Sequence, residues 1–143
     1  MKLIIAGSRS FSHEFLGGIF PDFTSNCHQA VHQLMGIEAD IKEIVHGGCP
    51  SGVDSFADLQ WDSYYDIIET SVFKADWNKY GKFAGPKRNS QMAAYGDALF
   101  LIWDGKSRGS LSMKNEMLKR RKPIFEMILC SYNVAKSNNI SDR

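Results

Sequence analysis

The chain has 143 residues, enough for one domain with a buried core, and carries 17 basic against 16 acidic residues. A net charge of +1 argues against a protein that coats duplex nucleic acid, because such proteins carry a strong basic excess. No apolar run reaches the length of a membrane span, and the three cysteines match neither a disulfide framework nor a zinc site, which predicts a cytoplasmic protein without a metal site.

Short apolar runs alternate with segments of helical periodicity along the chain. The run 98–103 is apolar throughout, which is typical of a central strand buried on both faces. Gly36 marks the end of a helix, and Pro86 suits the first turn of another. In chain order we expect strand 3–6, helix 23–35, strand 41–45, helix 51–65, strand 67–73, loop 74–85, helix 86–95, strand 98–103, helix 110–121 and strand 123–129.

This alternation with short connections predicts a single α/β domain over residues 1–130. The expected architecture is a Rossmann-like three-layer sandwich with a mainly parallel five-stranded sheet. Residues 131–143 are polar and are expected to form a frayed C-terminal tail. Ligands of such folds bind at the carboxyl edge of the sheet, where the strand order reverses, so we expect the functional site there.

Four strand-to-helix turns reach this edge and supply glycines, hydroxyl groups and cations. Gly47 and Gly48 lie between a strand and a helix, so their backbone N–H groups and the helix dipole favour a phosphate or another anion. The glycine spacing matches neither the Walker pattern nor the dinucleotide-binding fingerprint. The predicted ligand-binding residues are Gly7, Ser8, Arg9, Gly47, Gly48, Asp54, Trp77, Arg88, Lys106, Ser107, Gly109 and Ser110.

Several of these residues also have an ordinary structural interpretation. Arg88 could clamp a phosphate through two hydrogen bonds or form a surface ion pair. Asp54 could hold a ribose hydroxyl, act as a general base, or cap the helix that begins near Ser51. Trp77 could stack on a base or pin its long loop to the protein body. His46 could act as an acid or base, or be a hydrogen-bonded side chain at the end of a strand.

Ordered motifs run along the chain from Met1 to about Leu129: Gly7-Ser8-Arg9, Val45-His46-Gly47-Gly48 with Gly52 and Asp54, Ala75-Asp76-Trp77, Tyr80-Gly81, Ala84-Gly85-Pro86, Arg88-Asn89, Met92, and Trp103-Asp104-Gly105-Lys106-Ser107-Arg108-Gly109-Ser110. In these motifs the chain resembles the YspA-like branch of the SLOG superfamily, which is found in bacteria and their phages. The resemblance implies a Rossmann-like core similar to that of the Lonely Guy phosphoribohydrolases and the DNA-processing protein DprA. It also implies a nucleotide or nucleotide-derived ligand.

Lonely Guy enzymes remove the base from a nucleoside monophosphate, and only part of their catalytic set has a counterpart in this chain. Arg88 falls where their arginine lies, and Gly105 to Ser110 falls where their glycine-rich segment lies. The position three beyond that segment is Met113 instead of glutamate, which puts hydrolysis by the same route in doubt. Glu116, three residues further on, could serve only with a shift in register. If the protein is an enzyme, the catalytic candidates are therefore Asp54, Arg88 and Glu116.

Three functions are consistent with these observations. The first is binding of a nucleotide or nucleotide-derived phosphorylated ligand by a sensor or ligand-binding protein that needs no cofactor. The second is N-glycoside hydrolysis of the phosphoribohydrolase type, which requires a carboxylate near the sugar. The third is single-stranded DNA binding, which is suggested only by DprA and is disfavoured by the balanced charge. The expected partner is a small nucleotide-type ligand, with no membrane and no nucleic acid, and related folds make a homo-oligomer possible.

Overall fold

A parallel sheet organises the computed structural model, which describes residues 1–62 and 68–130. In chain order the elements are β1 (Lys2–Gly7), α1 (His13–Ile19), α2 (Phe23–Met35), β2 (Glu43–His46), α3 (Gly52–Asp62), β3 (Glu69–Val72), α4 (Trp77–Tyr80), the 3-10 helix η1 (Gly81–Phe83), α5 (Ala84–Tyr95), β4 (Ala98–Trp103), α6 (Arg108–Lys119) and β5 (Ile124–Ile128). This confirms the predicted α/β, Rossmann-like architecture. The end of the expected helix 51–65, the first residue of the expected strand 67–73 and the expected tail 131–143 lie outside the described residues.

The strand order is β3-β2-β1-β4-β5, and each neighbouring pair is parallel. The chain builds outward from β1 to β3, then crosses back and adds β4 and β5 on the other side. The order therefore reverses between β1 and β4, where Gly7 lies opposite Ile102. In open α/β sheets a reversal of this kind leaves a crevice beyond the carboxyl ends of the two strands.

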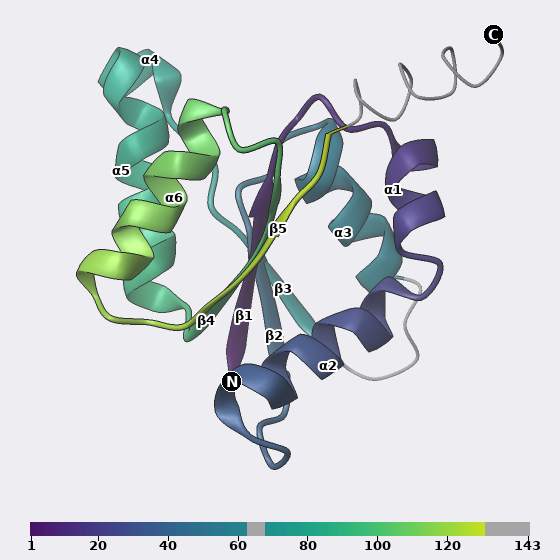
Figure 1. Cartoon of the computed structure of the whole chain (residues 1–143). Helices are drawn as coiled ribbons and strands as arrows, with labels where there is room; N and C mark the ends of the chain where they lie inside the picture. Colours follow the sequence, from purple (N-terminus) through teal and green to yellow (C-terminus); the bar gives the residue numbers. More distant parts are fainter. Residues whose placement is uncertain (63–67, 131–143) are drawn as a thin grey trace, which may run out of the picture.

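Helices cover both faces of the sheet and make it the middle of three layers. α1, α2 and α3 lie on one side, and α4, α5 and α6 lie on the other (Figure 1). β4 is buried along its whole length because alternate side chains enter the two cores, whereas β3 forms an edge and is mostly exposed. Over the described ranges, none of the helices combines the length and the apolar character needed to cross a bilayer.

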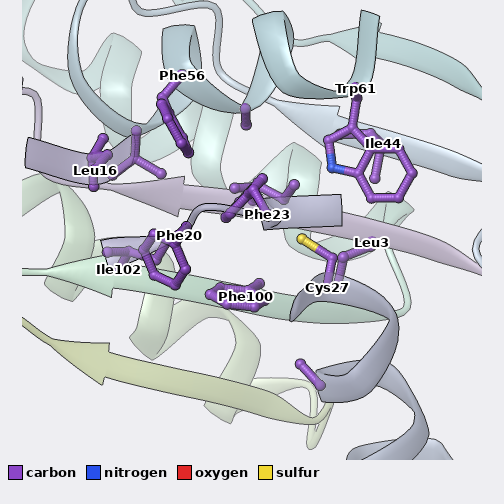
Figure 2. Close-up of a cluster of buried hydrophobic side chains, with 14 of the residues drawn as sticks. Leu3, Leu16, Phe20, Phe23, Cys27, Ile44, Phe56, Trp61, Phe100 and Ile102 are labelled. Carbon is purple, nitrogen blue, oxygen red and sulfur yellow. The ribbon is translucent and has the colours of Figure 1, made fainter. Parts of the chain in front are cut away.

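Aromatic rings hold the α1–α3 layer against the sheet (Figure 2). Phe23, the first residue of α2, is 1% exposed. The centroid of its ring lies 5.3 Å from those of Phe20 and Phe56 and 5.7 Å from that of Phe100. Since Phe56 belongs to α3 and Phe100 to β4, Phe23 joins two helices to the centre of the sheet. The core of the opposite layer includes Ile4, Met92, Leu101, Met113 and Met117.

Helix α1 has no counterpart among the elements expected from the sequence. Ser12 caps it, because its Oγ accepts a hydrogen bond from the Phe15 N–H at 3.0 Å. Gly17 and Gly18 lower the helical propensity of the segment, and Leu16 is its one buried residue. The segment therefore lacks the periodic apolar face by which the longer helices are found in the sequence.

The expected loop 74–85 also contains helical structure, namely α4, η1 and the first two residues of α5. Asp76 starts α4, since its Oδ1 accepts a hydrogen bond from the Lys79 N–H at 3.0 Å. None of the side chains of α4 and η1 is buried, and Phe83 is 66% exposed. Exposed apolar side chains of this kind are not arranged as a core-facing stripe, which is why the sequence pattern indicates a loop.

Replacing Phe23 with alanine is expected to lower the free energy of unfolding by about 3–5 kcal/mol, because it removes a buried ring. Urea unfolding followed by circular dichroism measures the change. Phe83→Ala is the matched control, and its cost should stay within about 0.5 kcal/mol because the ring is exposed. Equal losses in the two variants would contradict the central position of Phe23 in the core.

Candidate functional site

A cleft of about 610 Å³ opens at the carboxyl edge of the sheet. The turns after β1, β2 and β4 line it together with the start of α4 and one face of α5. Its volume falls in the range of about 300–1,000 Å³ that is usual for small-molecule sites. The predicted ligand-binding residues that line it are Gly7, Ser8, Arg9, Gly47, Gly48, Asp54, Trp77, Arg88, Ser107, Gly109 and Ser110.

Ser8 joins three elements at the point where the strand order reverses. Its N–H donates to the Ile102 carbonyl at 3.1 Å, and its Oγ accepts from the Asp104 N–H at 3.1 Å. Its carbonyl oxygen accepts from the Val53 N–H at 3.3 Å. Gly52 permits this approach, because it has φ +74° and a Cβ at that position would lie 2.4 Å from the Ser8 oxygen. The floor of the cleft is therefore cross-linked by hydrogen bonds.

His46 fixes the glycine turn that follows β2. The buried ring has Nε2 2.8 Å from Asp58 Oδ1, and its Nδ1 accepts from the Gly48 N–H at 3.0 Å. An accepting Nδ1 carries no proton, so this arrangement corresponds to the neutral tautomer protonated on Nε2. His46 is thus the hydrogen-bonded side chain at a strand end. Because the Gly48 N–H is engaged internally, the expectation that it binds a phosphate needs correction: the turn shapes the cleft, and this amide is not free for an anion.

Arg88 projects from α5 and binds the backbone at two strand ends. Its Nη1 donates to the carbonyl oxygens of Gly47 at 2.7 Å and Phe73 at 3.2 Å, and its Nε donates to Asn89 Oδ1 at 3.0 Å. These acceptors are uncharged, and Arg88 forms no salt bridge with any described residue. Burial lowers the pKa of Arg88, and the charge of Asp54 partly offsets this. A guanidinium stays charged in proteins, so Arg88 can attract an anion into the cleft.

Asp54 is the one acidic side chain among the described residues that line the cleft. It is 8% exposed, and its Oδ2 accepts from the Cys49 N–H at 3.2 Å. Burial raises the pKa of Asp54, while the Cys49 N–H and the Arg88 charge act in the opposite direction. This hydrogen bond joins α3 to the glycine turn, so the Asp54 carboxylate contacts the turn that comes before Ser51. A contact with a ribose hydroxyl stays a prediction.

The start of α6 forms the opposite wall of the cleft. Asp104 Oδ1 accepts from the N–H groups of Lys106 and Ser107, each at 2.8 Å, and this shapes the loop before the helix. Ser107 is the N-cap residue, but its side chain makes no capping hydrogen bond. The first N–H groups of α6 therefore present the positive end of the helix dipole at the cleft, where Gly109 and Ser110 lie.

Trp77 begins α4 and packs over the first turn of α5. A Cβ on Gly85 would lie 3.2 Å from Cη2 of the indole, which shows how closely the ring approaches the helix. The side chain is still 52% exposed and lines the cleft. The packing therefore attaches α4 to α5, and the free part of the ring leaves room for a stacked base, which stays a prediction.

Two of the predicted site residues lie outside the cleft. Lys106 does not line it, and the neighbouring cation Arg108 does. Glu116 also lies outside, where its carboxylate accepts from Lys119 Nζ at 3.1 Å and from Arg120 Nη1 at 2.7 Å. Arg120 holds the pKa of Glu116 below its usual value. A carboxylate engaged by two cations away from the cleft does not fit the catalytic role considered for it.

Asn89 is a site residue that sequence reasoning did not single out. It is buried, it accepts from Arg88, and its Nδ2 donates to the Gly109 carbonyl at 3.2 Å and Ser112 Oγ at 3.3 Å. It therefore orients Arg88 and holds α5 to α6. Its place beside Arg88 in the motif was the available signal. The other lining residues, which lie outside the predicted ligand-binding set, are Ala6, Cys49, Pro50, Lys74, Ala75, Met92, Arg108 and Met113.

Comparisons with protein-family models, with curated proteins and with solved structures found no match for this chain. Membership of the SLOG superfamily therefore stays a prediction that depends on the motifs alone. In the part of the chain that the structure describes, no group of three or more His, Cys, Asp and Glu side chains is arranged to hold a metal ion. The chemistry of the cleft must accordingly be argued from its own charges and hydrogen bonds.

Gly47→Ala is expected to displace Arg88, because the added Cβ would lie 2.5 Å from Nη1 of Arg88. We expect the lost hydrogen bonds to lower the unfolding free energy by about 1–3 kcal/mol, measured by scanning calorimetry. Gly109→Ala is the control, since a Cβ there meets nothing within 4 Å, and its stability should be unchanged or slightly higher. Wild-type stability in Gly47→Ala would contradict the packing described for Arg88.

The burial of Asp54 predicts a pH dependence of stability. Its pKa is higher in the folded than in the unfolded chain, so its ionisation costs stability as the pH rises through the folded value. Asp54→Asn removes this titration, and its unfolding free energy relative to wild type should therefore rise between about pH 4 and about pH 8. Urea unfolding at both pH values measures the difference.

Asp40→Asn is the control for this measurement. Lys42 lowers the pKa of Asp40, so loss of that carboxylate should give the opposite trend or none. A relative stability of Asp54→Asn that stays flat or falls with pH would contradict the role assigned to burial. The comparison therefore separates the buried carboxylate from a general effect of removing negative charge.

Proposed function

We propose that the protein binds a nucleotide or nucleotide-derived phosphorylated ligand in the cleft, as a sensor or ligand-binding protein. The observation that carries the proposal is the charge of the cleft. Its lining cations are Arg9, Lys74, Arg88 and Arg108, and they face a single carboxylate, Asp54. Cations gathered in a concave site attract phosphate more strongly than the same charges spread over an open surface.

The phosphate is expected at the α6 side of the cleft. The N–H groups of Gly48 and Cys49 are engaged by His46 and Asp54, which leaves the first turn of α6 as the better backbone donor. Arg108 lies in that turn. A phosphate there would combine backbone N–H groups, the helix dipole and a guanidinium, the three features that favour anions at helix starts.

Two further residues favour a nucleoside over a bare phosphate. Asp54 offers a carboxylate that accepts hydrogen bonds from sugar hydroxyls, on the β2–α3 side of the cleft. Trp77 offers an exposed aromatic face that can stack on a base. A ligand with a phosphate, a sugar and a base would contact all three kinds of group.

The proposal predicts that a panel of nucleoside phosphates contains at least one member that raises the melting temperature. A ligand at about one hundred times its Kd stabilises by about 2.7 kcal/mol, which corresponds to roughly 5–10 °C for a chain of this length. Arg108→Ala and Arg88→Ala should abolish the shift. Lys106→Ala is the matched control, because Lys106 is an exposed cation two positions away that lies outside the cleft.

Isothermal titration calorimetry of the same variants separates loss of binding from loss of stability. Arg88 also supports the strand ends, so Arg88→Ala can lower the melting temperature by itself, whereas Arg108 is exposed and makes no described salt bridge. If Lys106→Ala weakens binding as much as Arg108→Ala does, the cleft is not the site. If no nucleoside phosphate binds, the proposal fails.

N-glycoside hydrolysis is the second candidate function, and the buried Asp54 carboxyl beside Arg88 is the observation that favours it. Such a reaction develops positive charge on the sugar, which a carboxylate stabilises. Against it, Met113 lines the cleft where a second acid is expected. The Asp104 carboxylate accepts the Ser107 N–H in the loop before α6, and Glu116 lies outside the cleft. Chromatography after incubation with nucleoside monophosphates should show no free base. Base release that Asp54→Asn abolishes would establish the hydrolase instead.

A further inference from the structure

The charges are distributed unevenly along the chain. Residues 1–73 contain three Lys and Arg against ten Asp and Glu, whereas residues 74–122 contain twelve Lys and Arg against four Asp and Glu. The net charge of +1 therefore conceals an acidic part and a strongly basic part. Charge asymmetry of this size indicates that one part of a protein faces a polyanion.

The helices of the two parts lie on opposite sides of the sheet. α1, α2 and α3 belong to the acidic part, and α4, α5 and α6 belong to the basic part (Figure 1). Some basic side chains of this part have acidic partners nearby, since Lys114 pairs with Glu126 of β5, and Lys119 and Arg120 pair with Glu116. These pairs lie along α6 and β5, away from α4 and η1, so the α4–η1 end of the layer keeps its cations.

A basic aromatic surface lies at that end, formed by Lys79, Tyr80, Lys82, Phe83 and Lys87. None of the three lysines forms a salt bridge with a described residue. The Lys87 and Lys79 ammonium groups lie 4.3 and 5.2 Å from the centroid of the Tyr80 ring, and Lys82 lies 5.4 Å from that of Phe83. Phe83 is 66% exposed. Residues 79–87 thus place each of these lysines close to an aromatic ring.

The only carboxylate in residues 74–87 does not neutralise these cations. It belongs to Asp76, whose Oδ1 accepts the Lys79 backbone N–H and caps α4. Trp77 follows it and lines the cleft, so the basic aromatic surface continues from the cleft edge onto α5. The surface itself contributes no residue to the cleft lining and can be tested separately.

We propose that the basic aromatic surface binds single-stranded nucleic acid. The lysines contact backbone phosphates, and the exposed Phe83 ring stacks on a base. Charge alone would serve any polyanion, but aromatic side chains add affinity only where base faces are open, as they are in a single strand and not in a duplex. An anionic lipid surface offers no base for the Phe83 ring to stack on. The proposal goes beyond the small ligand of the cleft and does not require it.

The test is fluorescence anisotropy with labelled oligothymidine and oligouridine over a range of salt concentrations. Binding should weaken with salt, with a slope of about −0.7 for each phosphate contact. Lys79→Glu combined with Lys82→Glu should reduce the affinity by about tenfold or more and make the slope shallower. Phe83→Ala should reduce the affinity by about fivefold or more and leave the slope unchanged, because it removes stacking without removing charge.

Lys82→Glu alone should also weaken binding, and Lys42→Glu is its matched control, since it makes the same charge change on an exposed lysine in the acidic part. The affinity of the Lys42→Glu variant for the oligonucleotides should stay within about twofold of wild type. This change is much smaller than the loss of affinity expected when one stacked base is lost. The double lysine variant should keep the melting-temperature shift with nucleoside phosphates, so failure of this proposal is distinct from failure of the cleft ligand.

Four outcomes overturn the proposal. The first is no binding of single strands at low salt, and the second is equal weakening by Lys42→Glu and Lys82→Glu. The third is equal affinity for duplex DNA or for phosphatidylserine vesicles, which would show that charge alone acts. The fourth is salt-sensitive self-association abolished by Lys79→Glu with Lys82→Glu, which would show that the acidic part of a second copy occupies the surface.

Discussion

The guanidinium of Arg88 binds the carbonyl oxygens of Gly47 and Phe73, which directly follow β2 and β3, and the shape of the cleft depends on these bonds. Carbonyl groups at the ends of parallel strands have no further partner within the sheet and require donors from elsewhere. Arg88 supplies them and at the same time places a cation beside Asp54. Since the absence of a side chain on Gly47 makes the approach possible, one glycine and one arginine set both the closure of the strand ends and the charge of the site.

Apolar patterning was sufficient for the elements that carry the core. The strand 98–103 and the helix 23–35 have the expected bounds, because both bury most of one or two faces. The sequence did not predict α1 and α4. Each of these helices begins at a single capping contact, of Ser12 or Asp76, and few of their side chains are buried. β3 has the expected place in the order but is exposed, since its position at the sheet edge depends on topology and not on its own composition.

The site was predictable where fold geometry alone decides it, since the carboxyl ends of parallel strands meet at one edge. What could not be predicted is which acceptor each donor uses: the Gly48 N–H goes to His46, and Asn89 bridges Arg88 to α6. Arg108 lines the cleft in place of the predicted Lys106. Which of the two cations does so depends on the residue at which α6 begins, and the apolar pattern defines that residue only within a few positions. The basic aromatic surface was not predicted, because the net charge of the whole chain is a sum over an acidic part and a basic part.

The three tryptophans of the chain lie in very different surroundings. Trp61 and Trp103 are 4% and 5% exposed, whereas Trp77 is 52% exposed at the edge of the cleft. A water-soluble quencher such as iodide will therefore reach Trp77 and spare the other two indoles, and emission at longer wavelengths will come from that one residue. The unlabelled protein thus contains an intrinsic fluorescent reporter, Trp77, whose emission and quenching would change when a ligand occupies the cleft.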